Sequence, residues 1–248
     1  IPEAITGGIC PFETLEGACN AVIATIQSGI PVARIELLDA LQVKASNAYS
    51  KLSLEETPTL LLEFHGSETG VKEQAEMFAE IATEFGGGEF KWARGQEERT
   101  KLWQARHDAY WACVALRPGA KAVATDVCVP ISRLAECITE RRRDLDEVGL
   151  IAPIVGHVGD GNFHVSLMVD MDQPENVAAA QGFMARLVER AIAMDGTCTG
   201  EHGIGHGKAK YLRAELGDTV DFMRMIKRAI DPRDIMNPGK SLPEGTNH

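Results

Sequence analysis

Apolar and polar positions alternate along this chain with two periods, one typical of helices and one typical of strands. Between residues 14 and 28 the apolar side chains recur at helical spacing, which predicts an amphipathic helix that starts near Pro11–Thr14. Short runs rich in Val, Ile and Leu predict strands. Together the two patterns predict helices over 14–28, 39–50, 71–85, 97–116, 130–147, 174–194, 209–216 and 219–230, and strands over 32–38, 59–65, 89–93, 121–129, 151–155 and 165–169.

This order of elements predicts an α+β fold. Several helices return to neighbouring strands, and the glycine signatures of Rossmann and P-loop folds are missing from the sequence. We therefore expect a doubled ferredoxin-like arrangement of split βαβ units, with an antiparallel sheet covered by helices and a helical tail over about 209–248. Residues 1–9 are interrupted by glycine and carry no predicted element. The length allows one large domain or two small ones, and no internal repeat is visible by eye.

Composition and charge narrow the function classes. The chain of 248 residues is 44% hydrophobic and 25% charged, which is enough for a sizeable core. Its net charge of −11 argues against nucleic acid as a partner, since phosphate binding needs a basic face. The one dense basic run is 141–143. We expect these arginines on the solvated side of a helix, paired with Glu140, Asp144 and Asp146.

The cysteines and the termini bear on location. Six cysteines are spread without a Cys-x-x-Cys pair, which is typical of buried thiols in a reducing compartment. No apolar run approaches the ~20 residues of a membrane span. No signal or transit peptide is visible, but the chain begins at Ile1 rather than Met. We expect a cytoplasmic location, with a membrane-associated location or the mitochondrial matrix left open.

Two glycine-rich runs carry the candidate chemistry. Gly156–His164 reads Gly-His-Val-Gly-Asp-Gly-Asn-Phe-His, and Gly196–Gly207 contains a Glu-His pair. Imidazole and carboxylate groups are common ligands of divalent metals, and glycine lets the backbone turn sharply. We predict a catalytic metal centre formed by His157, His164 and Glu201, with the two histidines on either side of a hairpin-like loop. The alternative is that they are hydrogen-bonded loop histidines.

The residues beside the predicted ligands allow other interpretations. His202 is placed to accept a proton from a metal-bound hydroxyl, but it could instead be a further ligand or a core histidine. Asp160 either orients a ligand histidine or only forms the turn. His206 and Lys208 could simply start the following helix.

Arg106 is the candidate for binding an anion. It lies on a predicted helix with Trp103, Tyr110 and Trp111, and its planar guanidinium could bind a substrate carboxylate. An ion pair with Asp108 or Glu98 is the alternative, and the sequence by itself slightly favours it.

Several motifs together resemble the C-terminal half of flavoproteins related to vanillyl-alcohol oxidase and para-cresol methylhydroxylase. In particular, they are similar to the branch of D-lactate dehydrogenase (cytochrome) and the glycolate oxidase D-subunit. The resemblance covers nearly the whole chain and implies that residues 1–248 are one domain, the C-terminal substrate- and metal-binding cap of an FAD-linked oxidase. Its motifs are Val-Ala-Arg-Ile-Glu-Leu-Leu-Asp (32–39), Leu-Trp-Gln-Ala-Arg-His-Asp (102–108), Ala-Leu-Arg-Pro-Gly (115–119), Thr-Asp-Val-Cys-Val-Pro (125–130), the two glycine-rich runs, and Asp-Pro-x-x-Ile-Met-Asn-Pro-Gly-Lys (231–240).

The resemblance implies a role for each matching residue. His157, His164 and Glu201 would hold Zn²⁺, Mn²⁺ or Fe²⁺. His202 would take the hydroxyl proton of a D-2-hydroxy acid while its α-hydrogen leaves as hydride to N5 of FAD. Arg106 would help to bind the substrate anion, and Asn237 would approach the flavin.

Two departures from the family pattern restrict the range of expected substrates. Relatives that act on D-2-hydroxyglutarate carry Thr and Lys where this chain has Tyr110 and Ala124. A distal carboxylate would therefore lack partners, which favours a short or apolar-tailed acid such as D-lactate, with Tyr110 in the substrate pocket.

The resemblance also implies partners. The family binds FAD mainly through an N-terminal domain that nothing in this sequence resembles, so we expect this chain alone to hold little FAD and to be inactive. An electron acceptor would be a cytochrome, a quinone or a flavoprotein, and a homodimer stays open. The other function classes are a metal-dependent hydrolase using the same ligands and a non-catalytic binding or dimerisation domain.

Overall fold

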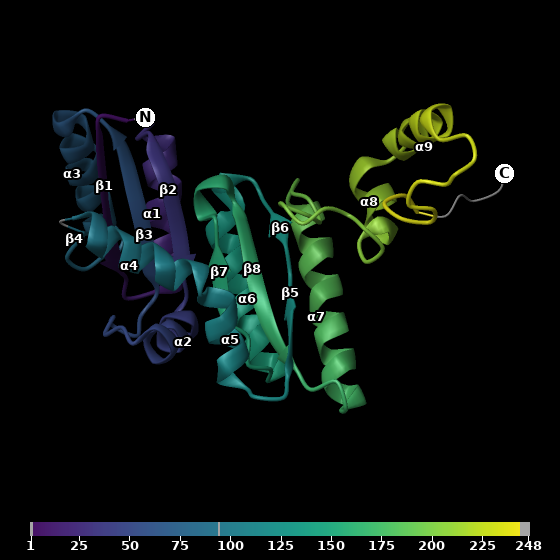
Figure 1. Cartoon of the computed structure of the whole chain (residues 1–248), viewed down its shortest axis with the longest axis horizontal. Coiled ribbons are helices and arrows are strands. Elements are labelled where there is room, and N and C mark those ends of the chain that lie inside the picture. Colours follow the sequence, from purple (N-terminus) through teal and green to yellow (C-terminus); the bar gives the residue numbers. More distant parts are fainter. Residues whose placement is uncertain (1, 94, 244–248) are drawn as a thin grey trace.

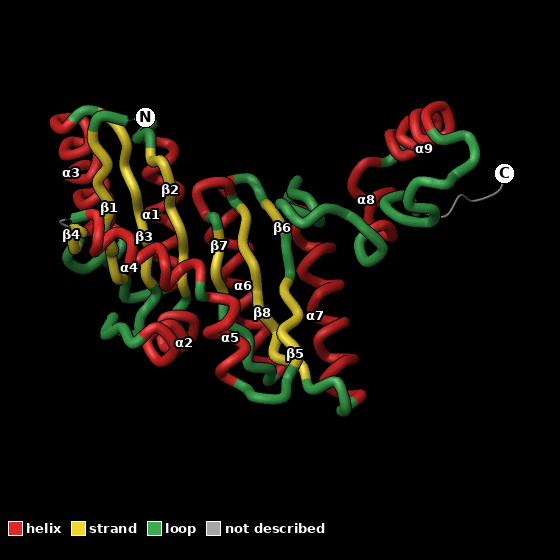
Figure 2. Tube along the Cα trace, viewed as in Figure 1, coloured by secondary structure: helices red, strands yellow, loops and turns green. Residues whose placement is uncertain are grey.

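A computed structural model describes residues 2–93 and 95–243. Its sheet has eight strands, all paired antiparallel, in the order β4-β1-β3-β2-β7-β8-β5, with β6 also paired to β8 (Figures 1 and 2). The α+β fold expected from the sequence is confirmed. Within the described residues, no helix is long and apolar enough to cross a membrane.

The first half of the chain is a ferredoxin-like unit with the strand order β4-β1-β3-β2. Its chain order is strand, helix, strand, strand, helix, strand, and one extra helix, α2, is inserted after the second strand. The elements are β1 (Ala4–Pro11), α1 (Leu15–Gln27), β2 (Val32–Leu38), α2 (Ala40–Ser50), β3 (Thr59–Gly66), α3 (Glu68–Glu84) and β4 (Lys91–Ala93).

The second half repeats this plan. Its first strand is broken into β5 and β6, and a single bridge between Cys128 and Thr197 stands in the place of a fourth strand. The equivalent strands β2 and β7 pair at the centre, so the sequence conceals a structural repeat. The elements are β5 (Lys121–Ala124), β6 (Val127–Cys128), η1 (Ile131–Arg133), α6 (Leu134–Val148), β7 (Ile154–Gly156), η2 (Val158–Asp160), β8 (Asn162–Val169) and α7 (Pro174–Ala193).

Helices cover both faces of the sheet. The main core lies on the face covered by α1, α3, α6 and α7, where it includes Phe64, Phe78, Phe163 and Phe183. The opposite face is crossed by α4 (Gln96–His107) and α5 (Ala109–Leu116), which link the halves and lie in front of the sheet in Figure 1. Strand side chains alternate between the two faces. Each strand therefore sends every second residue towards α4 and α5.

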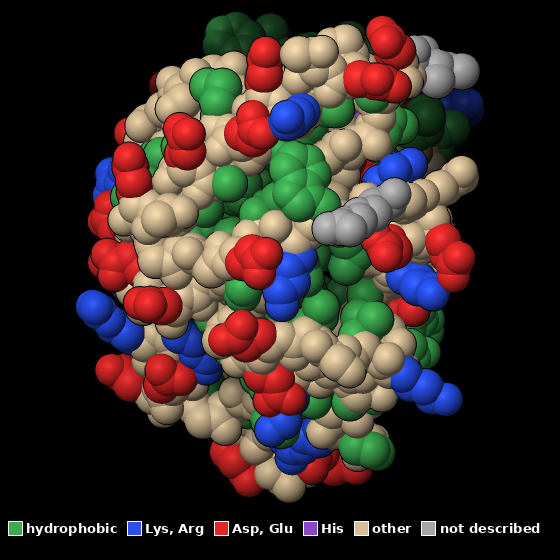
Figure 3. Space-filling model, turned by 90° about the vertical axis from the view of Figure 1, so that its left-hand side faces the viewer, with side chains coloured by type: hydrophobic (Ala, Val, Ile, Leu, Met, Phe, Trp, Pro, Cys, Tyr) green, Lys and Arg blue, Asp and Glu red, His purple; other side chains and the backbone are tan. Residues whose placement is uncertain are grey.

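The tail extends away from the sheet. It contains η3 (Ala209–Tyr211), α8 (Leu212–Leu216) and α9 (Thr219–Ile230), and Figure 1 shows α9 far from β1. The helical tail expected over 209–248 is present, although its last five residues lie outside the described ones. At the other end of the molecule, α3 carries five glutamates and one lysine. Acidic side chains are spread over the face of that end shown in Figure 3.

Three expectations about the elements were wrong. The helix expected over 97–116 is broken at Asp108, because α4 lies over β1 and β4 whereas α5 lies over β5 and β8. The strand expected over 121–129 is interrupted at 125–126, where Thr125 and Asp126 bind other segments. Residues 4–11 form β1 despite their glycines. Glycine at position 8 allows close packing, since an added Cβ would lie 2.6 Å from the Phe90 ring and from a backbone oxygen.

The basic run 141–143 was also misread. Arg141 is fully buried under α7, where it binds Asp144 at 2.7 Å and the Arg186 carbonyl at 3.2 Å. These contacts occupy Nη1 and Nη2 of the guanidinium, whereas its buried Nε has no hydrogen-bond partner among the described residues. The pairing with Asp144 and Asp146 was correct, but Glu140 pairs with Arg190 instead.

Candidate metal centre

The turn between β7 and β8 positions two histidines. His157 directly follows β7, and His164 lies within β8, so the expected hairpin-like arrangement is confirmed. Gly161 closes the turn with φ +78°, and a Cβ there would lie 2.1 Å from the Val129 carbonyl oxygen. Only glycine meets both requirements. The two imidazole rings consequently lie 6.0 Å apart, edge to face.

The loop that carries Glu201 and His202 is held by Asp126, which lies in the interruption between β5 and β6. The Asp126 carboxylate accepts hydrogen bonds from the backbone N–H groups of Glu201 (3.2 Å) and His202 (3.0 Å). It also accepts from Thr199 Oγ1 at 2.7 Å and Lys208 Nζ at 3.0 Å. Burial favours a higher pKa for Asp126, but these donors together hold its pKa below the usual range.

The predicted ligand atoms converge. His164 Nε2 lies 3.0 Å and His157 Nε2 lies 3.5 Å from Glu201 Oε1, and the three atoms all lie within 4.8 Å of one another. His202 stacks on His164 at 5.1 Å, and its Nε2 is 3.6 Å from the same carboxylate oxygen. The structure thus brings together all four residues of the predicted cluster.

Both ligand histidines present the same ring nitrogen to the centre. His157 Nδ1 donates to Glu36 Oε1 at 2.5 Å, and His164 Nδ1 donates to the Thr125 carbonyl at 2.9 Å. Since each acceptor fixes the proton on Nδ1, Nε2 keeps its lone pair. The hydrogen bond to Glu36 raises the pKa of His157, whereas burial lowers the pKa of His164.

A second set of potential ligands overlaps the first. Atoms of Asp126, His164 and His202 also lie within 4.8 Å of one another. However, both oxygens of Asp126 already accept hydrogen bonds from the Glu201 loop. Asp126 is therefore better suited to hold this loop than to bind a metal.

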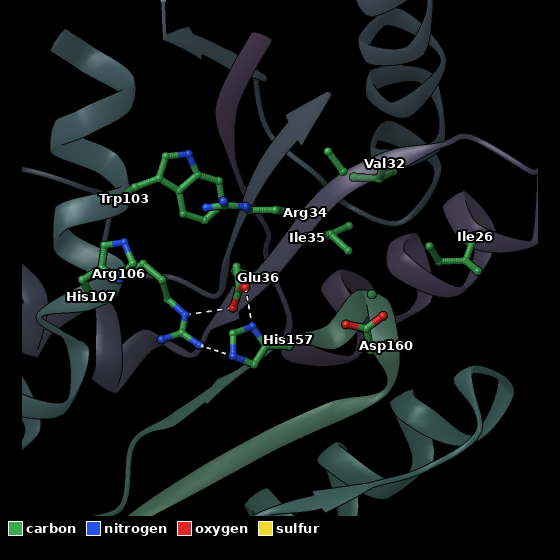
Figure 4. A pocket seen from close by; sticks show the side chains of 12 residues that line it. Ile26, Val32, Arg34, Ile35, Glu36, Trp103, Arg106, His107, His157 and Asp160 are labelled. Atoms are coloured by element: carbon green, nitrogen blue, oxygen red, sulfur yellow. Dashed lines mark hydrogen bonds and ion pairs between the residues drawn. The ribbon is translucent and has the colours of Figure 1, made fainter. Parts of the chain in front are cut away.

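Arg106 forms an ion pair, but with a different residue from those expected. Its Nε donates to Glu36 Oε2 at 2.8 Å, and its Nη2 lies 3.3 Å from His157 Nε2 (Figure 4). Tyr110 is 47% exposed and packs against the Trp111 ring at 5.3 Å.

Two cavities adjoin this cluster. The smaller, of about 210 Å³, is lined by Arg106, Tyr110, Ala124 and the predicted ligands. The larger, of about 410 Å³, shares Arg106 and His157 and is otherwise lined by residues such as Ile35 and Trp103 (Figure 4). The positions singled out for substrate choice, Tyr110 and Ala124, thus lie in the same cavity as the ligands.

The remaining predicted residues lie outside the cluster. Asp160 closes the turn through its backbone, and in the described contacts its carboxylate binds neither ligand histidine. Asn237 has φ +51° and lines a separate hollow beside α9 with Lys227 and Lys240. Lys208 does more than precede η3, because it binds Asp126.

Glu36 and Asp126 are the residues that sequence reasoning missed. Each contacts the cluster from a segment distant in sequence, Glu36 from β2 and Asp126 from the interruption between β5 and β6. A signal existed for Glu36, since it is the acidic residue among the apolar positions 35–38. A carboxylate at such a position needs a partner.

Comparisons with known proteins identify the family of the chain. The family of FAD linked oxidases, C-terminal domain, matches residues 1–241. The chain is 48% identical to a probable mitochondrial D-lactate dehydrogenase of Danio rerio over 98% of its own length and 49% of that protein. It is 44% identical to the mitochondrial D-lactate dehydrogenase [cytochrome] of Arabidopsis thaliana (98% and 43%), and 30% identical to glycolate oxidase subunit GlcD of Bacillus subtilis (96% and 51%). The chain therefore spans about half the length of these curated relatives.

Solved structures share the fold. A 4-ethylphenol oxidase from Gulosibacter chungangensis aligns with a TM-score of 0.73 at 17% identity, over 98% of this chain and 55% of that one. A p-cresol methylhydroxylase aligns with a TM-score of 0.72 at 14% identity, over 100% of this chain and 54% of that one.

Proposed function

Because the chain belongs to the FAD linked oxidases as their C-terminal domain, we propose that it forms the substrate- and metal-binding part of a flavin-dependent D-2-hydroxy acid dehydrogenase. The convergence of His157 Nε2, His164 Nε2 and Glu201 Oε1 is the observation that carries this proposal. The names of the relatives, D-lactate dehydrogenase and glycolate oxidase subunit, support the reaction class.

The residues present fit a divalent metal. Two imidazole nitrogens and one carboxylate oxygen suit Zn²⁺, Mn²⁺ or Fe²⁺, and three protein ligands leave room for a substrate. Both histidines have their Nδ1 proton engaged, which leaves Nε2 ready to bind. When bound, the metal supplies a positive charge that lowers the pKa of a hydroxyl group.

The chain's own residues then perform two tasks beside the flavin. His202 Nε2 accepts the proton of the substrate hydroxyl, and its backbone is fixed by Asp126. Arg106 binds the substrate carboxylate through the part of its guanidinium that does not contact Glu36. FAD, held mainly by an N-terminal domain and approached by Asn237, supplies the acceptor for the α-hydrogen as hydride.

The cavity beside the ligands favours a small substrate. Its volume is about 210 Å³, and Tyr110 and Ala124 replace the polar pair that a distal carboxylate would need. D-lactate fits these constraints. Relatives named for a cytochrome and for mitochondria support a cytochrome as the electron acceptor and the mitochondrion as the location.

Metal content and flavin reduction test the proposal. We expect about one equivalent of Zn, Mn or Fe in the intact protein, purified without chelator, and reduction of its flavin by D-lactate. His157→Ala and Glu201→Ala should lose both. His65→Ala is the matched control, since its side chain is 37% exposed, as is that of His157, and it pairs with another buried glutamate. Metal retained in His157→Ala would contradict the ligand assignment, and hydrolysis without flavin reduction would favour the metal-dependent hydrolase.

A further inference from the structure

Glu36 lies where the two halves of the sheet meet. β2 pairs with β7 through Leu37 opposite Gly156 and Leu38 opposite Val155. This register places Glu36 opposite His157, on the face covered by α4 and α5. The neighbouring residues Ile35 and Leu37 point into the main core. Glu36 itself is only 6% exposed.

Both carboxylate oxygens of Glu36 are used by the candidate site. Oε1 accepts from His157 Nδ1 at 2.5 Å, and Oε2 accepts from Arg106 Nε at 2.8 Å (Figure 4). An ionised carboxylate can accept both bonds, whereas an amide offers a single acceptor oxygen. The same side chain therefore orients a metal ligand and a substrate-binding arginine.

Another buried carboxylate on the same face shows what is particular to Glu36. Glu63 of the adjacent strand β3 is 7% exposed and binds His65 Nε2 and Trp103 Nε1, each at 2.7 Å. Its burial and its imidazole partner match those of Glu36. Neither of these partners belongs to the metal cluster, however.

We infer that Glu36 is a positioning residue that couples metal binding to substrate-anion binding. This inference rests on the proposed function. Glu36 holds His157 so that Nε2 faces Glu201, and it holds Arg106 by Nε alone. Arg106 Nη2 lies 3.3 Å from His157 Nε2, the atom to which a metal would bind. Metal binding would thus remove an acceptor from Nη2 and leave that donor for the substrate carboxylate.

The test compares Glu36→Gln with Glu63→Gln in the intact protein. Zinc affinity is measured by competition with a chromophoric chelator, and affinity for pyruvate is measured from the perturbed flavin absorbance, with and without zinc. In Glu36→Gln we expect zinc affinity to fall about 10- to 100-fold. We also expect zinc to strengthen pyruvate binding less than it does in the parent. Glu63→Gln should match the parent in both measurements.

The outcomes are distinguishable. A parent protein that binds no zinc, manganese or iron would overturn the proposed function and this inference with it. A parent that binds metal while Glu36→Gln binds it equally well would overturn the inference alone. A fall in melting temperature without a change in either affinity would make Glu36 merely structural. Should Glu36→Gln not fold, Glu36→Asp keeps the charge but shortens the arm, and it should show the same two losses.

Discussion

The carboxylate of Asp126 accepts a hydrogen bond from the backbone N–H of His202 at 3.0 Å. Through this bond a residue of the interrupted strand holds a loop that has no regular secondary structure. The positions of the candidate ligand Glu201 and the candidate base His202 therefore depend on Asp126, which binds their backbone N–H groups and not their side chains.

We predict that Asp126→Asn weakens the metal centre without removing a ligand. The amide retains one acceptor oxygen, so donors from Glu201, His202, Thr199 and Lys208 compete for it. Metal affinity should fall about tenfold or more, because the loop loses its anchor. Competition titration measures this fall. Asp160→Asn, a nearby change whose side chain does not hold the loop, should leave the affinity unchanged, and equal affinities in both variants would contradict the role of Asp126.

Substitution of Gly161 should disrupt the turn that separates the two histidines. Gly161→Ala combines a φ of +78° with a Cβ placed 2.1 Å from a backbone oxygen, so the turn must move. We expect loss of bound metal and a destabilisation of roughly 3 kcal/mol or more. Gly119→Ala is the matched control, since its φ is +88° but its Cβ would meet nothing within 4 Å. Gly119→Ala should lower the free energy of unfolding by about 1 kcal/mol and should retain the bound metal. Chemical denaturation and metal analysis measure the two effects.

Substrate preference should respond to the two cavity positions. The double variant Tyr110→Thr with Ala124→Lys restores the polar pair that the family pattern associates with D-2-hydroxyglutarate. Because both positions line the cavity beside the ligands, a distal carboxylate would gain a charged partner. We expect kcat/KM for D-2-hydroxyglutarate to rise relative to that for D-lactate by about tenfold or more. Ala122→Lys, two residues away on β5, serves as the control, and an unchanged ratio in the double variant would contradict the assigned cavity.

Asp39 gives the stability of the fold a pH dependence. Its carboxylate is 3% exposed, and burial raises its pKa to about 6, although it accepts from the Gln42 N–H at 2.8 Å. Since the folded state holds the proton more tightly, this contribution to stability is complete below the unfolded pKa near 3.8 and is lost as the pH rises through about 6. As the pH rises from 4 to 8, the free energy of unfolding of Asp39→Asn should therefore increase by roughly 1–3 kcal/mol relative to that of the parent. Denaturant unfolding at both pH values measures this difference, and a parallel pH profile in the two proteins would contradict it.

The sequence was most informative where the chemistry is local. His157 and His164 share one short run, and Glu201 and His202 share another, so the glycines and the residue types indicated the cluster directly. The doubled ferredoxin-like fold also followed from the order of the elements. What the sequence did not reveal depends on pairing between distant segments.

Glu36 and Arg141 illustrate this limit. The role of Glu36 follows from the β2–β7 register, and a shift of one residue would place it on the other face. Arg141 lies in a charged run that is typical of a solvated helix, yet α7 covers it and supplies its carbonyl partner. In both cases the environment of a polar side chain was set by an element remote in sequence.

The short pairing of β2 with β7 divides the site between two structural repeats. The second repeat contributes His157, His164 and the Glu201 loop, while the first contributes Glu36, and Arg106 comes from the helix that links them. A fragment limited to residues 121–243 would keep every predicted metal ligand but would lack both Glu36 and Arg106. The candidate site is therefore complete only where both repeats and the helix between them are present in one chain.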